Sequence, residues 1–543
     1  MDLSKDDLQA FDPADPRYRG KLWVRIVTPD RIYRHVFVRR IVFVLGGLAI
    51  AGWLGTAASV WAFVKFNRGY TDASFLDLAF YPVRAAHYRA GLGRHYLKLG
   101  REELEKKNYL TGYNLLVAGL ARVPDDVAAR RLVAFTQIRL GRTDQALKTL
   151  GEGALLAGAD LDYLKLLFGL LHEAQEDERI LTLAHTLLPA QPDNLLAHQF
   201  VALQAATAHY ERGRYDEAER IIAEWRLTDS LEGEIVLAQC DWERGFPELA
   251  LLRLEREVAR FPKRDELYLQ LVRLHRELGH TAEARRYALL RQLNDPASPG
   301  PRIDLLHTYR ATDDRAAEQR ELAAYLADFS ADPQALILLA WFAVDTAQPE
   351  LAQRLHELAR TRRFPANAFN LAQVQTALAV QDYRAALAFA DGALREESED
   401  NPHFASTLNG LRALALFGLK DTSRAELLLN TFLGQASLRA ADALLLAKQL
   451  RLLGATVQAR AVLDRACALD PLNQAALGEL IRADAESGNR EKLAVNLPKF
   501  LRLRKPSRAI LEETLLHLDQ SADGPLRAQI RDALTRASAT PAP

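Results

Sequence analysis

The sequence is poor in the residues on which several kinds of site chemistry depend. Cys240 and Cys467 are its two cysteines, too few for a disulfide scaffold and not spaced as a CxxC pair for zinc or redox chemistry. Lys+Arg and Asp+Glu are both 70, so the formal net charge is zero. Affinity for phosphate backbones depends on excess positive charge, and this balance therefore argues against a generally basic nucleic-acid binder.

Apolar residues make up 49% and charged residues 26% of the 543 residues, which is the balance of an ordinary folded protein. This length fits three or four domains, or one long repeat array. Lysine is scarce, with 14 Lys against 56 Arg, and Ala and Leu are abundant. Such a composition is typical of a GC-rich bacterial genome, so we expect a bacterial protein.

One segment is far more apolar than the rest. Ile41 to Val64 is a run of 24 residues without a charge, which as a helix is about 36 Å long and can cross a bilayer. Four arginines precede it, and two basic residues follow it: Arg31, Arg34, Arg39 and Arg40, then Lys65 and Arg68. Positive charge favours the cytoplasmic side. We therefore expect a single-pass inner-membrane protein with a cytoplasmic N-terminus, a periplasmic C-terminal region, and an aromatic belt at Trp61, Phe63, Phe66 and Tyr70.

A cleaved signal peptide is the alternative, but the run is longer than a typical apolar signal region and some 40 residues precede it. A buried core helix is disfavoured because no other segment is apolar for so long. Small residues recur every fourth position of the span, at Gly47, Ala51, Gly55 and Ser59. They predict a close helix contact and a possible homodimer, unless they reflect the ordinary abundance of Gly and Ala in such helices.

A repeat of about 34 residues fills the rest of the chain. A Gly is followed five positions later by a small residue, and about twelve further by Pro, as in Gly245, Ala250 and Pro262, or Gly279, Ala284 and Pro296. Related sets contain Gly141 with Ala146, Gly213 with Ala218, and Gly454 with Ala459 and Pro471. Units are expected to begin near residues 93, 127, 161, 199, 231, 265, 302, 333, 367, 406, 440 and 474.

This pattern resembles the tetratricopeptide repeat (TPR) family over about residues 87–506. The resemblance implies an all-α fold, a right-handed α-solenoid of about 12 TPR-like helix hairpins. The predicted organisation is a cytoplasmic, mostly flexible tail over 1–36 with some structure near Trp23, a transmembrane helix over 37–66, and a juxtamembrane segment and entry helix over 67–92. The solenoid follows over 93–506, then capping helices over 507–537 and a disordered tail over 538–543.

No enzyme signature stands out. GEGALLAG at Gly151–Gly158 lacks the preceding strand of a phosphate loop. No HExxH or GxSxG occurs, and His275 and His280 are spaced five apart, which does not place them on one helix face. The acidic run at 396–400 is typical of a solvated turn. We therefore expect no catalysis, no metal and no cofactor.

The resemblance implies a binding surface on the first helix of each unit. Carrying the family's groove positions onto this sequence gives a partner-binding set of Phe135, Phe200, Leu203, Tyr210, Ile235, Trp242, Leu269, Arg273, Arg276, Ile337 and Trp341. Aromatic side chains and Arg are common anchors of interfaces. The alternative is that some of them are plain core. The carboxylate clamp of chaperone-binding members is absent, because Lys165, Gly169, Leu203 and Thr207 occupy positions of that pattern.

These observations favour a non-catalytic scaffold anchored in the membrane, which binds proteins or peptides of an envelope assembly such as secretion, pilus or exopolysaccharide export, or quality control. Three alternatives stay open. The array can face the cytoplasm with reversed topology, it can carry an unrecognised enzyme site in the groove, or it can be a passive spacer.

Overall fold

The computed structural model describes residues 2–3, 16, 19–27, 32–396, 402–520 and 523–537. The chain divides into two compact units, Met1–Leu170 and Leu171–Pro543, and each is described by itself. The predicted disordered tail at 538–543 and the acidic run at 397–400 lie outside the described residues.

The N-terminal segment contains strands that the sequence analysis does not predict. β2 (Trp23–Val27) and β3 (Ile32–Val36) form an antiparallel hairpin in which Val24 pairs with His35, and β1 (Asp2–Leu3) lies parallel to β2. WVRIV and IYRHV are rich in β-branched and aromatic residues, which favour strands. The expectation of a mostly flexible tail over 1–36 is therefore wrong for this hairpin.

A long apolar helix follows the hairpin. α2 (Val38–Ala62) continues as a π-helix, η2 (Phe63–Asn67), to give 30 helical residues with a mean hydropathy of 2.0 in their most apolar stretch. The helix is long and apolar enough to cross a membrane. Gly47, Ala51, Gly55 and Ser59 are all exposed on it, and a Cβ added at Gly47 or Gly55 would meet no atom within 4 Å.

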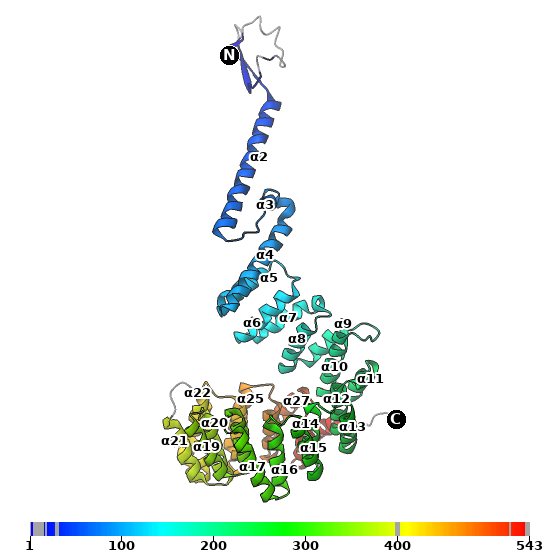
Figure 1. The fold of residues 1–543 in the computed structure, drawn as a ribbon, viewed down its shortest axis with the longest axis vertical. Coiled ribbons are helices and arrows are strands. Elements are labelled where there is room, and N and C mark those ends of the chain that lie inside the picture. The colour runs from blue at the N-terminus through cyan, green and yellow to red at the C-terminus, as the bar shows by residue number, and fades with distance from the viewer. Residues whose placement is uncertain are drawn as a thin grey trace. The chain divides into compact units, whose positions relative to one another are not determined.

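The chain then turns back along α2. The short helix α3 (Phe75–Ala79) packs beside α2, and α4 (Tyr81–Glu105) leads away from it (Figure 1). The sequence places an entry helix before a unit that begins at 93, but α4 is one continuous helix. No proline interrupts it after Pro82, and the first residue beyond its start with a left-handed conformation is Lys107 (φ 64°).

The rest of the first unit is made of hairpins. α4 pairs with α5 (Tyr109–Leu120), and α6 (Val127–Arg139) pairs with α7 (Thr143–Ala157). α4 and α5 cross at glycines, since a Cβ at Gly119 would lie 2.9 Å from the Gly93 carbonyl oxygen. The small residues allow the two backbones to approach closely.

Helix hairpins continue through the second unit, as neighbouring antiparallel pairs in Figure 1. The first helices are α8 (Leu161–Glu173), which begins in the first unit, α10 (Leu196–Glu211), α12 (Leu231–Glu243), α14 (Asp265–Glu277), α16 (Gly300–Ala311), α18 (Pro333–Asp345), α20 (Asn367–Ala379), α22 (Pro402–Gly418), α24 (Ala440–Leu452), α26 (Gln474–Glu486) and α28 (Arg508–Leu516). Their partners are α9 (Asp177–Leu187), α11 (Tyr215–Glu224), α13 (Pro247–Arg260), α15 (Thr281–Asn294), α17 (Arg315–Phe329), α19 (Pro349–Arg362), α21 (Tyr383–Glu396), α23 (Thr422–Gly434), α25 (Thr456–Leu469), α27 (Arg490–Arg502) and α29 (Gly524–Ala537). A 3₁₀ turn, η3 (Leu227–Asp229), precedes α12.

The prediction of an all-α solenoid of TPR-like hairpins preceded by one apolar helix is confirmed. Several first helices begin at the residue where the repeat pattern begins a unit, among them α6, α8, α12, α14, α18, α20, α24 and α26. Ala218, Ala250 and Ala284 have no exposed surface where paired helices cross, as the repeat requires.

The turn between paired helices needs one residue with a left-handed backbone. Glycine supplies it at Gly213, Gly245 and Gly279, with φ between 69° and 87°. In the unit near 302, which lacks this glycine, Asp313 adopts φ 52° at the same place. The turn is therefore kept where the sequence signal is lost.

Candidate functional site: the concave surface of the second unit

The packing of the second unit shows which helices lie on its concave side. First helices of successive units contact one another, as do α10 with α12, α16 with α18, α18 with α20 and α24 with α26. Successive second helices make no comparable contact in the described residues. An array in which one set of helices packs more closely curves toward that set, so the first helices line the inside of the curve.

The predicted groove residues divide by exposure. Leu269 (42% exposed), Trp341 (37%), Arg273 and Arg276 are open to solvent on α14 and α18. Four others are half-buried: Phe200, Leu203, Trp242 and Ile337. Tyr210 and Ile235 are buried, 8% and 7% exposed, so they do not offer the open area expected of them. Phe135 lies in the first unit, on α6, with the Arg139 guanidinium 5.6 Å from its ring centroid.

The structure brings some of these residues together from three helices. Tyr210 of α10, Ile235 and Trp242 of α12, and Arg273 of α14 line one cavity of about 60 Å³. Gln239 and Gln270 add amide groups to its wall. A cavity of this size holds a small side chain rather than a cofactor, so it can act as one subsite of a longer recognition surface.

Farther along the concave side, α14, α16 and α18 carry a set of charged and aromatic groups. His307 packs edge-on against Phe342 with ring centroids 4.9 Å apart. Burial lowers the pKa of His307 to about 4, and the positive charge of Arg276 acts in the same direction. Burial raises the pKa of Asp345, and Arg276 opposes that shift. His307 is therefore a neutral imidazole at pH 7.

The C-terminal end of the array contacts its beginning in the second unit. Residues 502–505, which are the last residue of α27 and the three after it, lie against α8, α9, α10 and α12. Arg212 donates from Nη1 to the carbonyl oxygens of Arg502 and Leu503, at 2.7 and 3.2 Å. The backbone N–H of Lys505 donates to the Glu211 carbonyl oxygen at 2.6 Å. We call this set of interactions the closing contact.

Two charged side chains of residues 504–505 anchor the closing contact. Arg504 pairs with Asp177, Nη2 to Oδ1 at 3.0 Å, and also donates to the carbonyl oxygen of His172. Lys505 pairs with Glu243, Nζ to Oε1 at 2.6 Å, and it also donates to the hydroxyl of Tyr210. Tyr210 is thus engaged by the chain's own lysine. These partners are hundreds of residues apart, and no short-range pattern in the sequence indicates them.

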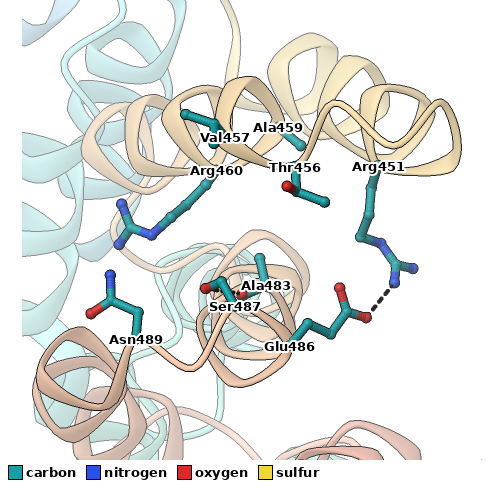
Figure 2. Close-up of a pocket in the computed structure, with 9 residues that line it drawn as sticks. All are labelled: Arg451, Thr456, Val457, Ala459, Arg460, Ala483, Glu486, Ser487 and Asn489. Atoms are coloured by element: carbon teal, nitrogen blue, oxygen red, sulfur yellow. Dashed lines mark hydrogen bonds and ion pairs between the residues drawn. The ribbon is translucent and has the colours of Figure 1, made fainter.

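A second crevice, of about 520 Å³, lies between α24, α25 and α26 (Figure 2). Its polar walls are already paired. Arg451 Nη1 lies 2.9 Å from Glu486 Oε1, and the Ser487 hydroxyl donates to the Ala483 carbonyl oxygen. Arg460 Nε lies 2.6 Å from Asp484, whose side chain has no exposed surface. The Arg451–Glu486 and Arg460–Asp484 pairs join successive units, so we assign the crevice a structural role.

The described residues offer no arranged set of catalytic groups. Burial raises the pKa of the Cys240 thiol to about 12 and that of Cys467 to about 11, so neither is a thiolate at neutral pH. Within the described residues no group of three or more His, Cys, Asp or Glu side chains is placed to hold a metal ion. GEGALLAG lies in α7 and its terminal turn, where Gly153 packs against Arg130 and Tyr163.

No protein-family model matches this chain, and no curated protein matches it. Similar solved structures include the yeast Tom70, with 15% identity over 90% of this chain and 96% of that one and a TM-score of 0.33. A tetratricopeptide repeat protein from Parabacteroides merdae shares 14% identity over 52% of this chain and 98% of its own, with a TM-score of 0.32. A structure of Naa15/Naa10 bound to HypK shares 14% identity over 90% and 75%, with a TM-score of 0.32. At these scores the similarity adds nothing to the functional argument, and the TPR-like hairpins are established by the packing of the chain itself.

Proposed function

We propose that this chain is a non-catalytic scaffold that α2 anchors in the bacterial inner membrane and that binds a partner protein of an envelope assembly on the concave side of its second unit. One observation carries the proposal. Leu269, Arg273 and Arg276 are exposed on α14, and Trp341 is exposed on α18, both of them first helices of the array. Tryptophan and arginine are enriched in binding hot spots, and the exposed leucine adds apolar area on the helix that carries the two guanidinium groups.

The proposed orientation places the N-terminal hairpin in the cytoplasm and the helical array in the periplasm. The four arginines before the apolar run and the two basic residues after it support this orientation. A reporter fused after Pro543 that is active only in the periplasm tests it. Activity of a reporter that works only in the cytoplasm would establish the reverse topology.

Site-specific photocrosslinking tests the binding surface. A photoreactive amino acid at Leu269, on the concave helix α14, is expected to capture a partner in intact cells. The matched control is Leu293, which is 75% exposed on the second helix α15 of the same hairpin. Equal capture at both positions, or capture at Leu293 alone, would contradict a concave binding surface.

Leu269→Glu is the corresponding loss-of-binding variant. A carboxylate at this exposed site leaves the core of α14 untouched but removes apolar contact area, so we expect the crosslinked partner to be lost from detergent extracts. Leu293→Glu makes the same chemical change on α15 and should retain the partner. If both variants retain every partner, the passive spacer is the better account.

A further inference from the structure

The residues just after α2 fold back onto it instead of leaving it. Trp53 Nε1 donates to the carbonyl oxygen of Ala79 at 2.7 Å, and Trp61 Nε1 donates to that of Ala73 at 2.9 Å. Leu78 and Ala79 of α3 are buried against Ala57 of α2. α3 therefore lies beside the C-terminal half of the apolar helix (Figure 1).

The position of these contacts along α2 determines how deep they lie in a bilayer that α2 spans. Trp53 is 12 residues beyond Ile41, where the uncharged run begins, and these residues span about 18 Å of helix. The hydrocarbon core of a bilayer is about 30 Å thick. If α2 spans the membrane, the Ala79 carbonyl that Trp53 contacts lies about 12 Å inside the hydrocarbon boundary at the C-terminal end of α2.

Several backbone polar groups of this segment are satisfied within the protein, as that depth requires because no water is present there. The two indoles occupy the carbonyl oxygens of Ala73 and Ala79. Phe80 donates its N–H to Leu76 and accepts from Val83 and Arg84. Pro82, in the first turn of α4, has no N–H to satisfy.

The one acidic side chain of α3 is also neutralised. Asp77 is 6% exposed, and its two carboxylate oxygens face Arg84 Nη1 at 3.2 Å and His87 Nδ1 at 3.1 Å. Arg84 and His87 lie on successive turns of α4, which runs away from α3, and both are more than half exposed. This arrangement buries the carboxylate and carries its two partners, the Arg84 guanidinium and the His87 imidazole, toward the headgroups.

The outer surface of the segment is apolar. Leu76 is 52% exposed, Phe80 57% and Val83 86%, and Val60 of α2 is 48% exposed. An apolar groove of about 360 Å³ opens between α2 and α4, lined by Trp53, Val60, Leu78, Tyr81 and Tyr88. Thr56, at its floor, turns its hydroxyl to the carbonyl oxygens of Gly52 and Trp53. Exposed apolar surface of this kind is unfavourable in water and costs nothing in lipid.

We propose that residues 75–83 are a re-entrant element immersed in the bilayer leaflet at the C-terminal end of α2, and that lipid acyl chains cover their apolar face and fill the groove. This proposal rests on the proposed function insofar as α2 must span the membrane. The membrane anchor then consists of α2 together with α3 and the first turn of α4, instead of α2 alone. The tryptophan–carbonyl bonds then fix the direction in which α4 leaves the membrane.

Nitroxide labels in full-length protein reconstituted into phospholipid vesicles test the proposal. Val83→Cys and Phe80→Cys report on the element, in a background with Cys240→Ala and Cys467→Ala. Val44→Cys, on α2, is the membrane control, and Leu110→Cys, 59% exposed on α5, is the aqueous control. Collisions with oxygen, which partitions into lipid, are compared with collisions with a water-soluble nickel chelate. Helix content and thermal midpoint equal to those of the unsubstituted protein are required of each variant.

We expect oxygen to dominate at Val83 and Phe80 as it does at Val44, and the nickel chelate to dominate at Leu110. A membrane signal at Val44 with an aqueous signal at both Val83 and Phe80 would overturn the re-entrant element alone. An aqueous signal at Val44 as well would overturn the membrane span. Protection of Val83 and Phe80 from both reagents would mean that a second copy of the chain, not lipid, covers the face.

Discussion

Arg504 and Asp177 form an ion pair across 327 residues of sequence, with Nη2 of the arginine 3.0 Å from Oδ1 of a carboxylate that has no exposed surface. The same carboxylate lies 3.5 Å from Nε of Arg212, at the end of α10. A buried charge is tolerated when it is paired and hydrogen-bonded. The pair therefore holds the link after α27 against the first hairpins of the second unit.

The closing contact changes what the array can do mechanically. A solenoid whose units touch their immediate neighbours alone can stretch and bend, because its stability is a sum of local interfaces. Here the second unit has one long-range interface that joins residues 172–243 to residues 472–505. Its concave surface is thus held in one curvature, which lowers the ordering cost of binding a partner.

Arg504→Ala is expected to release the closing contact. The variant leaves Asp177 buried with Arg212 as its remaining cation, and removal of one partner of a buried pair typically costs about 3–5 kcal/mol. Since Arg212 stays in place, we expect the lower end of that range. Hydrogen–deuterium exchange should rise at residues 172–178 and 503–507, with little change at α14 to α19.

Arg508→Ala is the matched control for Arg504→Ala. Its guanidinium pairs with Glu512 four residues away, and both side chains are about half exposed, 48% and 52%. Such a pair contributes a few tenths of a kcal/mol, so exchange near residues 172–178 should be unchanged. Equal protection in wild type and Arg504→Ala would show that the pair does not hold the contact.

A charge exchange at Lys505 and Glu243 tests the second anchor. Lys505→Glu places two carboxylates where Nζ and Oε1 are now 2.6 Å apart, so it should open the contact and raise exchange at residues 209–213. Adding Glu243→Lys restores opposite charges and should recover most of the protection. The coupling between the two substitutions is measured by the double-mutant cycle. Additive effects would assign the loss to the Tyr210–Lys505 bond instead.

Local features of the fold follow from the sequence because they depend on residues close together. The helix starts at Val127, Leu161, Asp265 and Gln474 coincide with the units that the Gly–Ala–Pro spacing predicts. Each hairpin is a self-contained pattern of a left-handed turn, a small residue at the crossing and an apolar stripe. Such a pattern is repeated often enough to be recognised even where single positions are replaced.

Features that depend on residues far apart in the chain do not follow from the sequence. The closing contact depends on the accumulated curvature of the whole second unit, which brings Lys505 to Glu243. A small change in the angle between successive hairpins, added over all the repeats, decides whether these residues meet. The contact of Trp53 with Ala79 depends on a chain reversal after η2, where Gly69 has a φ of 70°, and this single glycine does not indicate that the chain folds back along α2. The sequence does not predict the hairpin at Trp23–Val36, because its charged residues alternate with apolar ones and resemble a solvated tail. The family's groove positions place Tyr210 on the open surface, but they do not indicate that residues 502–505 cover it.

Two glycine-to-alanine substitutions should have opposite effects on stability. A Cβ at Gly119 would lie 2.7 Å from Leu97 side-chain atoms and 2.9 Å from the Gly93 carbonyl oxygen, so Gly119→Ala must separate α4 from α5. Overpacking of this kind typically costs about 1–3 kcal/mol. A Cβ at Gly169, in α8, meets nothing within 4 Å, so Gly169→Ala should gain about 0.5–1 kcal/mol of helix propensity. Thermal unfolding followed by circular dichroism measures both, and a Gly119→Ala protein as stable as wild type would contradict the close crossing.

Acidification should lower the stability of the folded protein through His307, which lies on the concave side of the second unit. Burial holds its pKa at about 4, below the 6.5 of an unburied imidazole. A histidine whose folded pKa is depressed binds protons more readily when unfolded, so its contribution is complete above pH 6.5 and is lost as the pH falls toward 4. The loss from this one group at pH 5 is at most about 2 kcal/mol. Burial also lowers the pKa values of His172, His209 and His275. On acidification the whole protein therefore loses more stability than His307 alone accounts for.

His307→Leu isolates the share that belongs to His307. Leucine keeps an apolar contact with Phe342 but cannot bind a proton, so the drop in thermal midpoint between pH 7 and pH 5 should be smaller than in wild type. His185→Leu, at a residue on the second helix α9, is the comparison and should leave the wild-type drop intact. An equal drop in thermal midpoint in wild type and His307→Leu would mean that protonation of the His307 imidazole costs the folded protein little stability. Arg276 and the apolar residues of α18 would then not keep the imidazole neutral.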